Sequence, residues 1–260
     1  MNQDIYQHYG KEEQSFIDQV FGWMQIVENR YSAYLTPFLT PREALIVKQL
    51  VASNENLAVY FRGGYEKAER KRALIVPPYH ELEEDDFNLS LLNIKFPVKF
   101  ANISHGKILG TLIGSGIDRE RIGDIITDGE AWHVIVDETI KLYLMSNVTK
   151  IGNVGVHLEE IEWEQILESN EAWETMTVIS SSLRLDAMLS NVYNFSRQRA
   201  KDQINAGNVK MNFMAMTRSD IEVKLNDIVS LRKYGRFWIQ SIDGVTKKDN
   251  YRLTVNVLIK

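Results

Sequence analysis

Apolar positions in the first eighty residues recur first at the spacing of helices and then as short strands. Apolar residues spaced three or four positions apart predict an amphipathic helix: Phe16, Val20, Trp23, Val27 and Tyr31. A second helix is predicted to begin at Thr40, because Pro41 stands at its first position and Glu43 lies three residues after the cap. Two strands around a glycine turn complete this part: 57–61, Gly63-Gly64 and 73–76.

The middle of the chain follows the order of a known supersecondary unit. Strict alternation of apolar residues from Leu92 to Phe100 predicts a strand with one buried face. The next predicted elements are helix 107–113, strands 124–127 and 132–136 around Asp128-Gly129, a helix over 140–148 and strand 154–158. This is the β-α-β-β-α-β order of ferredoxin-like and RRM-like domains. The strand at Trp132 lacks the aromatic RNA-stacking signature of RRMs, so the pattern predicts an RRM-like shape without RNA binding by its sheet.

The last third of the chain is predicted to form two short helices followed by strands. The first helix covers 183–189, and Ser196 is predicted to cap a second helix, which ends at Gly207. Arg197 and Lys201 are four residues apart and therefore share one face of this second helix. Strands are predicted at 209–211, 228–231, 237–239 and 253–259.

The distribution of charge points to a polyanionic partner. The formal net charge is −5, yet residues 181–260 carry 14 Lys and Arg against 7 Asp and Glu, a balance of +7. Residues 1–180 therefore carry −12. A basic module on an acidic body is the asymmetry expected when one part of a protein binds RNA or DNA. The carboxylate run at 81–86 is predicted to be a solvated linker and not a cation site.

Composition excludes several kinds of chemistry. The chain has no cysteine, which excludes disulfides, thiolate nucleophiles and cysteine-ligated metals. The five histidines are at positions 8, 80, 105, 133 and 157, which are too far apart in sequence for a local metal-binding or acid–base motif. Gly114-Ser115-Gly116 resembles the start of a dinucleotide fingerprint, but Arg119 replaces the third glycine and the preceding segment is predicted to be helical. No catalytic residue, metal ion or cofactor is predicted.

The length of the chain and of its apolar runs limits the number of domains and the cellular location that can be expected. With 260 residues the chain is near the size at which a single core stops growing, so two or three domains are expected. The N-terminus has no basic segment followed by an apolar one, and the longest apolar runs are far shorter than a membrane span. A cytoplasmic protein without a membrane partner is therefore expected.

Short motifs give the most specific signal in this sequence. Four landmarks resemble the S4 RNA-binding domain in order and spacing: Arg184-Leu185-Asp186, Ser196-Arg197, Ile204 to Val209, and Asp227-Ile228-Val229. Further motifs are similar to the YlmH family of S4-domain proteins: 61–65, 68–72, 110–116, 122–125, Gly235-Arg236-Phe237 and Thr246-Lys247-Lys248. The resemblance covers essentially the whole chain.

The resemblance, combined with the predicted elements, implies an α+β protein of three small domains. They are a mixed α/β N-terminal domain at 1–78, an RRM-like central domain at 79–165 and an S4 RNA-binding domain at 181–260. An acidic connector is expected at 166–180. The S4 domain is expected to present a two-helix face on a small antiparallel sheet.

The resemblance also implies a function. It is that of a non-enzymatic RNA-binding factor of Gram-positive bacteria, which acts on the large (50S) ribosomal subunit in ribosome-associated quality control. Such a factor would hold the tRNA of a stalled peptidyl-tRNA while an alanine tail is added to the nascent chain. Large-subunit rRNA and tRNA are therefore the expected partners. The protein itself is expected to be a monomer. Two alternatives stay open, an RNA-modifying enzyme that carries an S4 module and a structural protein of cell division.

Basic side chains are the expected RNA contacts, because phosphates and shape dominate the recognition of A-form RNA. The helix face is expected to contribute Arg184, Arg197, Arg199 and Lys201. The strand side is expected to add Lys210, Arg232, Lys233 and Arg236, with Lys247 and Lys248 beyond them. Asp186 is expected to pair with a neighbouring arginine or to cap the backbone, and not to contact RNA. A second RNA contact, or a solvated loop, is expected at Arg62, Arg70, Lys71 and Arg72.

Overall fold

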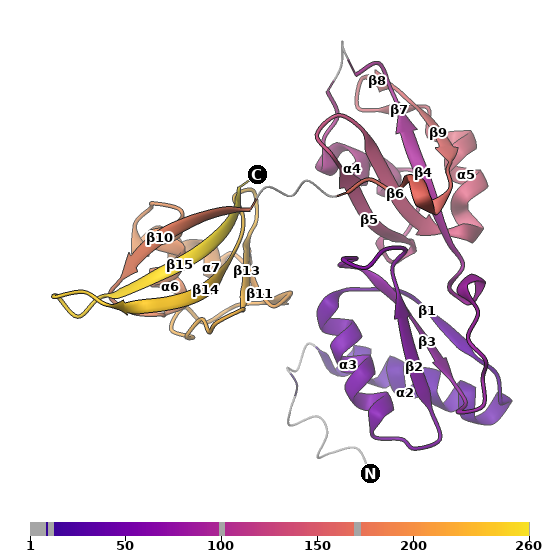
Figure 1. The fold of residues 1–260 in the computed structure, drawn as a ribbon, viewed down its shortest axis with the longest axis horizontal. Helices are drawn as coiled ribbons and strands as arrows, with labels where there is room; N and C mark the ends of the chain where they lie inside the picture. Colours follow the sequence, from indigo (N-terminus) through magenta and orange to yellow (C-terminus); the bar gives the residue numbers. More distant parts are fainter. Residues whose placement is uncertain (1–8, 10–12, 99–101, 169–172, 260) are drawn as a thin grey trace. The chain divides into compact units, whose positions relative to one another are not determined.

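The chain folds into two compact units, Met1–Asn170 and Glu171–Lys260. The structure is a computed structural model (Figure 1), and it describes residue 9 and residues 13–98, 102–168 and 173–259. Both units combine helices with antiparallel sheets, so the expectation of a mixed α and β protein is confirmed.

The N-terminal part of the first unit is a three-stranded sheet with two helices packed on it. Its elements are α2 (Gln14–Arg30), β1 (Tyr34–Leu39), α3 (Pro41–Ala52), β2 (Ala58–Arg62) and β3 (Lys71–Val76). The strands lie antiparallel in the order β1-β3-β2. The predicted cap of α3 is confirmed, because Glu43 N donates to Thr40 Oγ1 and Thr40 N donates to Glu43 Oε2. Strand β1 was not predicted, since Pro37 interrupts its pattern and its pairing with β3 shifts register there.

The central part of the first unit has the predicted β-α-β-β-α-β order. Its main elements are β4 (Leu89–Lys95), α4 (His105–Gly114), β5 (Ile122–Thr127), β6 (Trp132–Asp137), α5 (Lys141–Asn147) and β9 (His157–Glu160). The four strands are antiparallel in the order β5-β6-β4-β9. A small hairpin of β7 (Lys150–Ile151) and β8 (Val154–Gly155) precedes β9. Strand β4 ends at Lys95, earlier than the alternation predicted, and Phe100 lies outside the described residues.

Both faces of this four-stranded sheet are covered. Leu92 and Ile94 pack with helices α4 and α5 on one face. On the other face, Leu91 and Ile135 are buried against Phe38 of β1 and against the segment that follows β9. RRMs bind RNA on this second face, where exposed aromatic residues stack the bases. Because the face is buried here, it is not available for that mode of binding.

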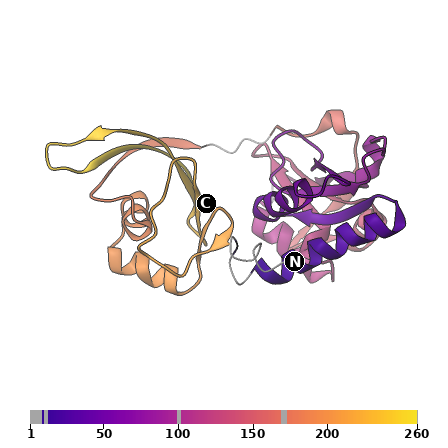
Figure 2. The same cartoon turned by 90° about the horizontal axis from the view of Figure 1, so that it is seen from below.

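The second unit is a six-stranded sheet with two helices on one side, as Figure 2 shows. Its elements are β10 (Glu174–Ser180), α6 (Leu185–Val192), α7 (Arg197–Asn205), β11 (Val209–Met211), β12 (Met214–Ala215), β13 (Ile228–Leu231), β14 (Gly235–Val245) and β15 (Tyr251–Ile259). The antiparallel order is β10-β15-β14-β13-β11-β12. Leu189, Ile204 and Phe237 belong to the shared core between helices and sheet.

Two details of the second unit bear on the sequence predictions. Ser196 caps α7 as expected, because Arg199 N donates to its Oγ at 3.2 Å. Residues 174–180, expected in a connector, form the edge strand β10, which pairs with residues 251–257 of β15. The sequence did not indicate this strand because Glu174–Ser180 is exposed except for Val178 and Ser180, so it shows little apolar alternation.

Candidate nucleic-acid interface

A buried carboxylate organises three cations on the helix side of the second unit. Asp186 lies in the first turn of α6, where backbone N–H groups of Leu185 and Asp186 donate to Ile221 O and Ser219 O and fix the helix start. Arg184 precedes the helix as its N-cap residue. Arg184 donates to Asp186 from Nε at 3.3 Å and from Nη2 at 3.4 Å. The predicted pairing of Asp186 with a neighbouring arginine is therefore confirmed.

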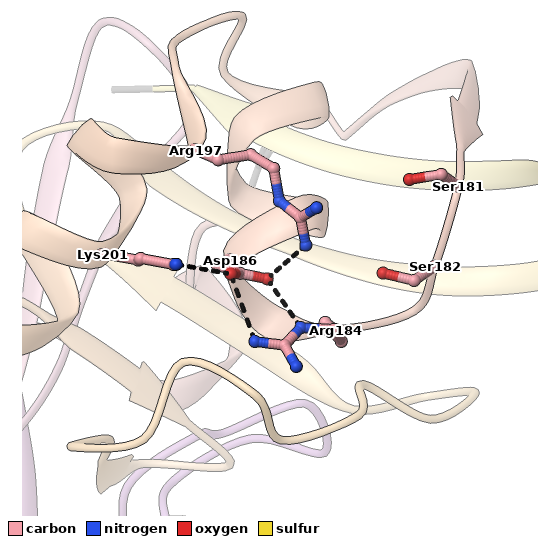
Figure 3. A pocket seen from close by; sticks show the side chains of 6 residues that line it. All are labelled: Ser181, Ser182, Arg184, Asp186, Arg197 and Lys201. Atoms are coloured by element: carbon pink, nitrogen blue, oxygen red, sulfur yellow. Dashed lines mark hydrogen bonds and ion pairs between the residues drawn. The ribbon is translucent and has the colours of Figure 1, made fainter.

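Helix α7 supplies the other two cations (Figure 3). Arg197 is its first residue, and its Nη2 donates to Asp186 Oδ1 at 3.0 Å. Lys201, one turn later, places Nζ 4.0 Å from Asp186 Oδ2. The four-residue spacing thus directs both side chains to the same point, as the sequence predicted. We name Arg184, Asp186, Arg197 and Lys201 the Asp186 cluster.

The Asp186 cluster presents a net positive charge to solvent. The Asp186 side chain is 1% exposed, whereas those of Arg184, Arg197 and Lys201 are 39%, 50% and 45% exposed. Burial would raise the pKa of Asp186, but hydrogen bonds from Arg184 and Arg197 and their charges hold it below its ordinary value. The carboxylate is therefore ionised at neutral pH. One anion among three cations leaves about two positive charges at the surface.

A shallow hollow of about 510 Å³ lies over the Asp186 cluster. Its remaining lining residues are Ser181 and Ser182, whose side chains point toward the cluster in Figure 3. Ser182 Oγ is buried, and it has no hydrogen-bond partner in the described part of the chain. Two arginines, a lysine and hydroxyl groups around one hollow are the donors that bind a phosphate oxygen.

Arg199 points away from the Asp186 cluster. Its guanidinium donates to Tyr234 Oη and lies over the rings of Phe195, at 5.3 Å, and Tyr234, at 5.8 Å. Tyr193 extends this aromatic group and contacts both rings. Arg199 thus belongs to a separate patch on α7, which the charge pattern alone could not distinguish.

The structure separates the other basic residues predicted in this unit. Arg232 and Lys233 lie in the turn between β13 and β14. Lys210 and Arg236 flank Ser230 in one register row, on the sheet face opposite the helices. Lys247 and Lys248 are exposed in the β14–β15 turn. Of the ten predicted residues, only Arg184, Arg197 and Lys201 converge on one carboxylate.

The four basic residues of the first unit divide into two kinds. Arg72 is 7% exposed, and its guanidinium donates to Thr36 O and lies 3.6 Å from Asp137. Arg70 donates to the carbonyls of Phe38 and Ile122. These two arginines hold the first unit together, and the expectation of a second RNA contact is narrowed to Arg62, which is exposed, and Lys71, which is half-buried.

Asp124 joins three of the motifs noted in the sequence. It is the acceptor for Glu69 N at 2.7 Å, for the Tyr65 hydroxyl at 2.9 Å and for Arg70 N at 3.0 Å. Burial raises the pKa of this carboxyl, against the lowering effect of those donors. The 61–65 and 68–72 motifs are therefore both bonded to the 122–125 motif, and their shared role is to fix the N-terminal part against the central sheet.

Comparison with known proteins places the chain in a family. Residues 12–80 match a family model described as "YlmH, N-terminal", and residues 82–165 match one described as "Putative RNA-binding domain in YlmH". A Bacillus subtilis (strain 168) relative, named "Ribosome-associated protein quality control protein P2", is 37% identical over 251 residues, which is 96% of this chain and 97% of the relative. The chain belongs to the YlmH family.

A solved YlmH structure supports the membership. It is named "Cell division protein ylmH from Streptococcus pneumoniae", with 35% sequence identity and a TM-score of 0.55. The similarity covers 63% of this chain and 99% of that one. The YlmH model at 82–165 coincides with the β-α-β-β-α-β part, whose RRM-type face is buried in this family member. An RNA contact of this part would therefore use another surface.

Two further findings concern metals and membranes. Within the described ranges of this YlmH protein, no three histidine or carboxylate side chains are grouped closely enough to hold a metal ion. None of the helices in these ranges is long and apolar enough to cross a membrane.

Proposed function

We propose that this YlmH family member is a non-catalytic, cytoplasmic RNA-binding factor that uses an S4-type surface on α6 and α7. The observation that carries the proposal is the Asp186 cluster, in which Arg184, Arg197 and Lys201 surround a buried carboxylate. A carboxylate held in this way fixes the three cations before RNA arrives, so less side-chain entropy is lost on binding. Structured RNA supplies phosphates at the regular spacing that such a fixed group can select.

The ribosome is the source of RNA that the family relationship favours. The Bacillus subtilis relative carries ribosome-associated quality control in its name and aligns over nearly the whole chain. We infer that the second unit binds rRNA and tRNA on the large subunit and stabilises stalled peptidyl-tRNA during alanine tailing. The basic charge of residues 181–260 and the exposure of Arg184, Arg197 and Lys201 beside α6 and α7 support this interpretation.

Sucrose-gradient sedimentation of a lysate tests the proposal. Wild-type protein is expected to travel with large subunits, and the double variant Arg184→Ala with Arg197→Ala is expected to stay at the top. The matched control removes the same charge from the same unit through Lys224→Ala with Arg252→Ala, two exposed residues outside the cluster. Loss of association in both double variants would indicate a general charge effect, and wild type at the top of the gradient would refute ribosome binding.

A salt titration distinguishes a phosphate contact from a structural role. Arg184→Ala is expected to weaken binding to a structured RNA such as purified tRNA and to reduce the slope of log affinity against log salt by roughly one unit. The reason is that one fewer counterion is released when one fewer phosphate is neutralised. Filter binding over a range of KCl concentrations measures the slope. Weaker binding at an unchanged slope would show that Arg184 acts by holding Asp186 and not by touching RNA.

A further inference from the structure

A second hollow lies at the end of α7 in the second unit. It has a volume of about 420 Å³ and is lined by Gln203, Asn208, Arg232, Lys233 and Tyr234. The size falls within the usual range for small-ligand pockets, which begins near 300 Å³. Its lining differs from that of the Asp186 cluster, because two amides and an aromatic ring accompany the two cations.

Hydrogen bonds hold the two amides in place. Asn208 Nδ2 donates to Gln203 Oε1 at 3.1 Å, and Asn208 N donates to Gln203 O at the same distance. The backbone of Asn208 is tied to the neighbouring turn, since Arg232 N donates to Asn208 O at 3.0 Å. The opposite atoms of the two amides, Gln203 Nε2 and Asn208 Oδ1, take no part in these bonds and have no hydrogen-bond partner within the described part of the chain. The pair therefore offers a donor and an acceptor side by side.

The ring of Tyr234 forms a rigid wall of this hollow. It makes edge contacts with Tyr193, at 5.7 Å between ring centroids, and with Phe195, at 5.8 Å. Its hydroxyl accepts a hydrogen bond from Arg199, whose guanidinium also lies over the ring, 5.8 Å from its centroid, so a stacked group would use the side of the ring that lines the hollow. The two aromatic contacts and the bond to the hydroxyl hold the Tyr234 ring in one orientation, so stacking a flat group on it costs little conformational entropy.

We propose that this hollow seats one unpaired nucleotide of the bound RNA. The base would stack on Tyr234 with its edge at the Gln203–Asn208 amides, and Arg232 and Lys233 would hold its phosphates. A paired nucleotide is excluded, because its edge is already bonded and its faces are already stacked. The inference builds on the proposed function, and it adds that the RNA has a base turned out of the helix beside the two-helix face.

A bare phosphate or sulfate is a poorer occupant of this hollow. An anion would use Arg232 and Lys233 but would leave the amide acceptor Asn208 Oδ1 facing a negative charge. A nucleobase satisfies that acceptor with an exocyclic amino or ring N–H group. The combination of acceptor, donor, ring and cations therefore favours a nucleotide over an isolated anion.

Binding to matched RNA hairpins tests the inference on the full-length chain. The set comprises four hairpins that each carry one bulged nucleotide, one for each base, the same hairpin with an abasic bulge, and the fully paired hairpin. Wild type is expected to bind at least one bulged hairpin about tenfold more tightly than the paired and abasic ones. Tyr234→Leu is expected to abolish this preference, whereas Tyr234→Phe keeps the ring and is expected to retain it.

Three outcomes would overturn the inference. Equal wild-type affinity for all six hairpins would mean that no nucleotide is seated. An equal loss of affinity for all six in Tyr234→Leu would assign the ring a purely structural role. Absence of binding to every hairpin would refute RNA binding itself, and the inference would fail together with the proposed function.

Discussion

Replacing Asp124 with alanine is expected to lower the free energy of unfolding of the first unit by about 3 kcal/mol. The substitution removes the acceptor for Glu69 N, Arg70 N and the Tyr65 hydroxyl at once. Each polar group that loses its partner in the interior costs about 1–3 kcal/mol. The total stays below the sum of three such costs, because the buried carboxyl itself carries a desolvation cost that alanine avoids.

Hydrogen exchange measured by mass spectrometry, over a series of urea concentrations, reports the stability of each unit separately. The control is Asp128→Ala, which removes an aspartate that also accepts backbone N–H bonds, from Glu130 and Ala131, but at an exposed turn where water can replace it. Its effect is expected to be much smaller. If both substitutions change protection of the first unit equally, Asp124 has no special role at the junction.

Replacing Asp186 with alanine is expected to lower the free energy of unfolding of the second unit by about 2–3 kcal/mol at neutral pH. Alanine removes the charge-assisted hydrogen bonds from Arg184 and Arg197, each of which is stronger than a neutral one. The cost stays below that of breaking a fully buried ion pair, because the three cations are about half exposed and can turn to water.

The loss of stability caused by Asp186→Ala is expected to become smaller as the pH falls. The pKa of Asp186 in the folded protein lies below its ordinary value of about 3.8, so the unfolded chain takes up the proton first as the pH falls. The stabilisation by this carboxylate is fully present above about pH 5 and is lost as the pH falls below about 4. The difference between wild type and variant is therefore expected to shrink in acid.

Urea unfolding followed by hydrogen exchange, at pH 7 and at a series of acidic pH values down to about pH 2, measures both effects. Asp220→Ala is the matched control, because Asp220 also pairs with an arginine two residues away, Arg218, but at an exposed position. It is expected to change neither stability nor its pH dependence measurably. An Asp186→Ala cost that does not shrink as the pH is lowered would show that packing, and not the charge, is what the aspartate contributes.

Local signals in the sequence predicted local structure well. The caps at Thr40 and Ser196 are satisfied by atoms within three residues, so the sequence alone contains what decides them. Strands β1 and β10 could not be predicted in the same way. Each is stabilised by a partner more than thirty residues away, β3 for the first and β15 for the second, and neither shows clear alternation of its own.

The candidate site was likewise predictable where it depends on local spacing and not where it depends on burial or on distant contacts. Arg197 and Lys201 share a helix face by spacing alone, and their convergence with Arg184 on Asp186 follows from the contact between α6 and α7. Charge could not distinguish these residues from Arg72, which is equally basic but is buried with Thr36 and Asp137 as partners. It also could not indicate Tyr234, since an aromatic residue in a turn carries no charge signal.

The covered sheet face of the first unit has a consequence for how that unit unfolds. Phe38 from β1 fills the same buried cluster as Leu91 and Ile135 of the central sheet. Neither part can therefore lose its structure without exposing apolar surface of the other, and the two behave as a single cooperative unit. A polypeptide cut between the two regions that the family models recognise, near residue 81, would leave Phe38 on one fragment and Leu91 and Ile135 on the other. The smallest piece that keeps this core whole extends through both regions and includes Leu167, the last residue of the shared cluster.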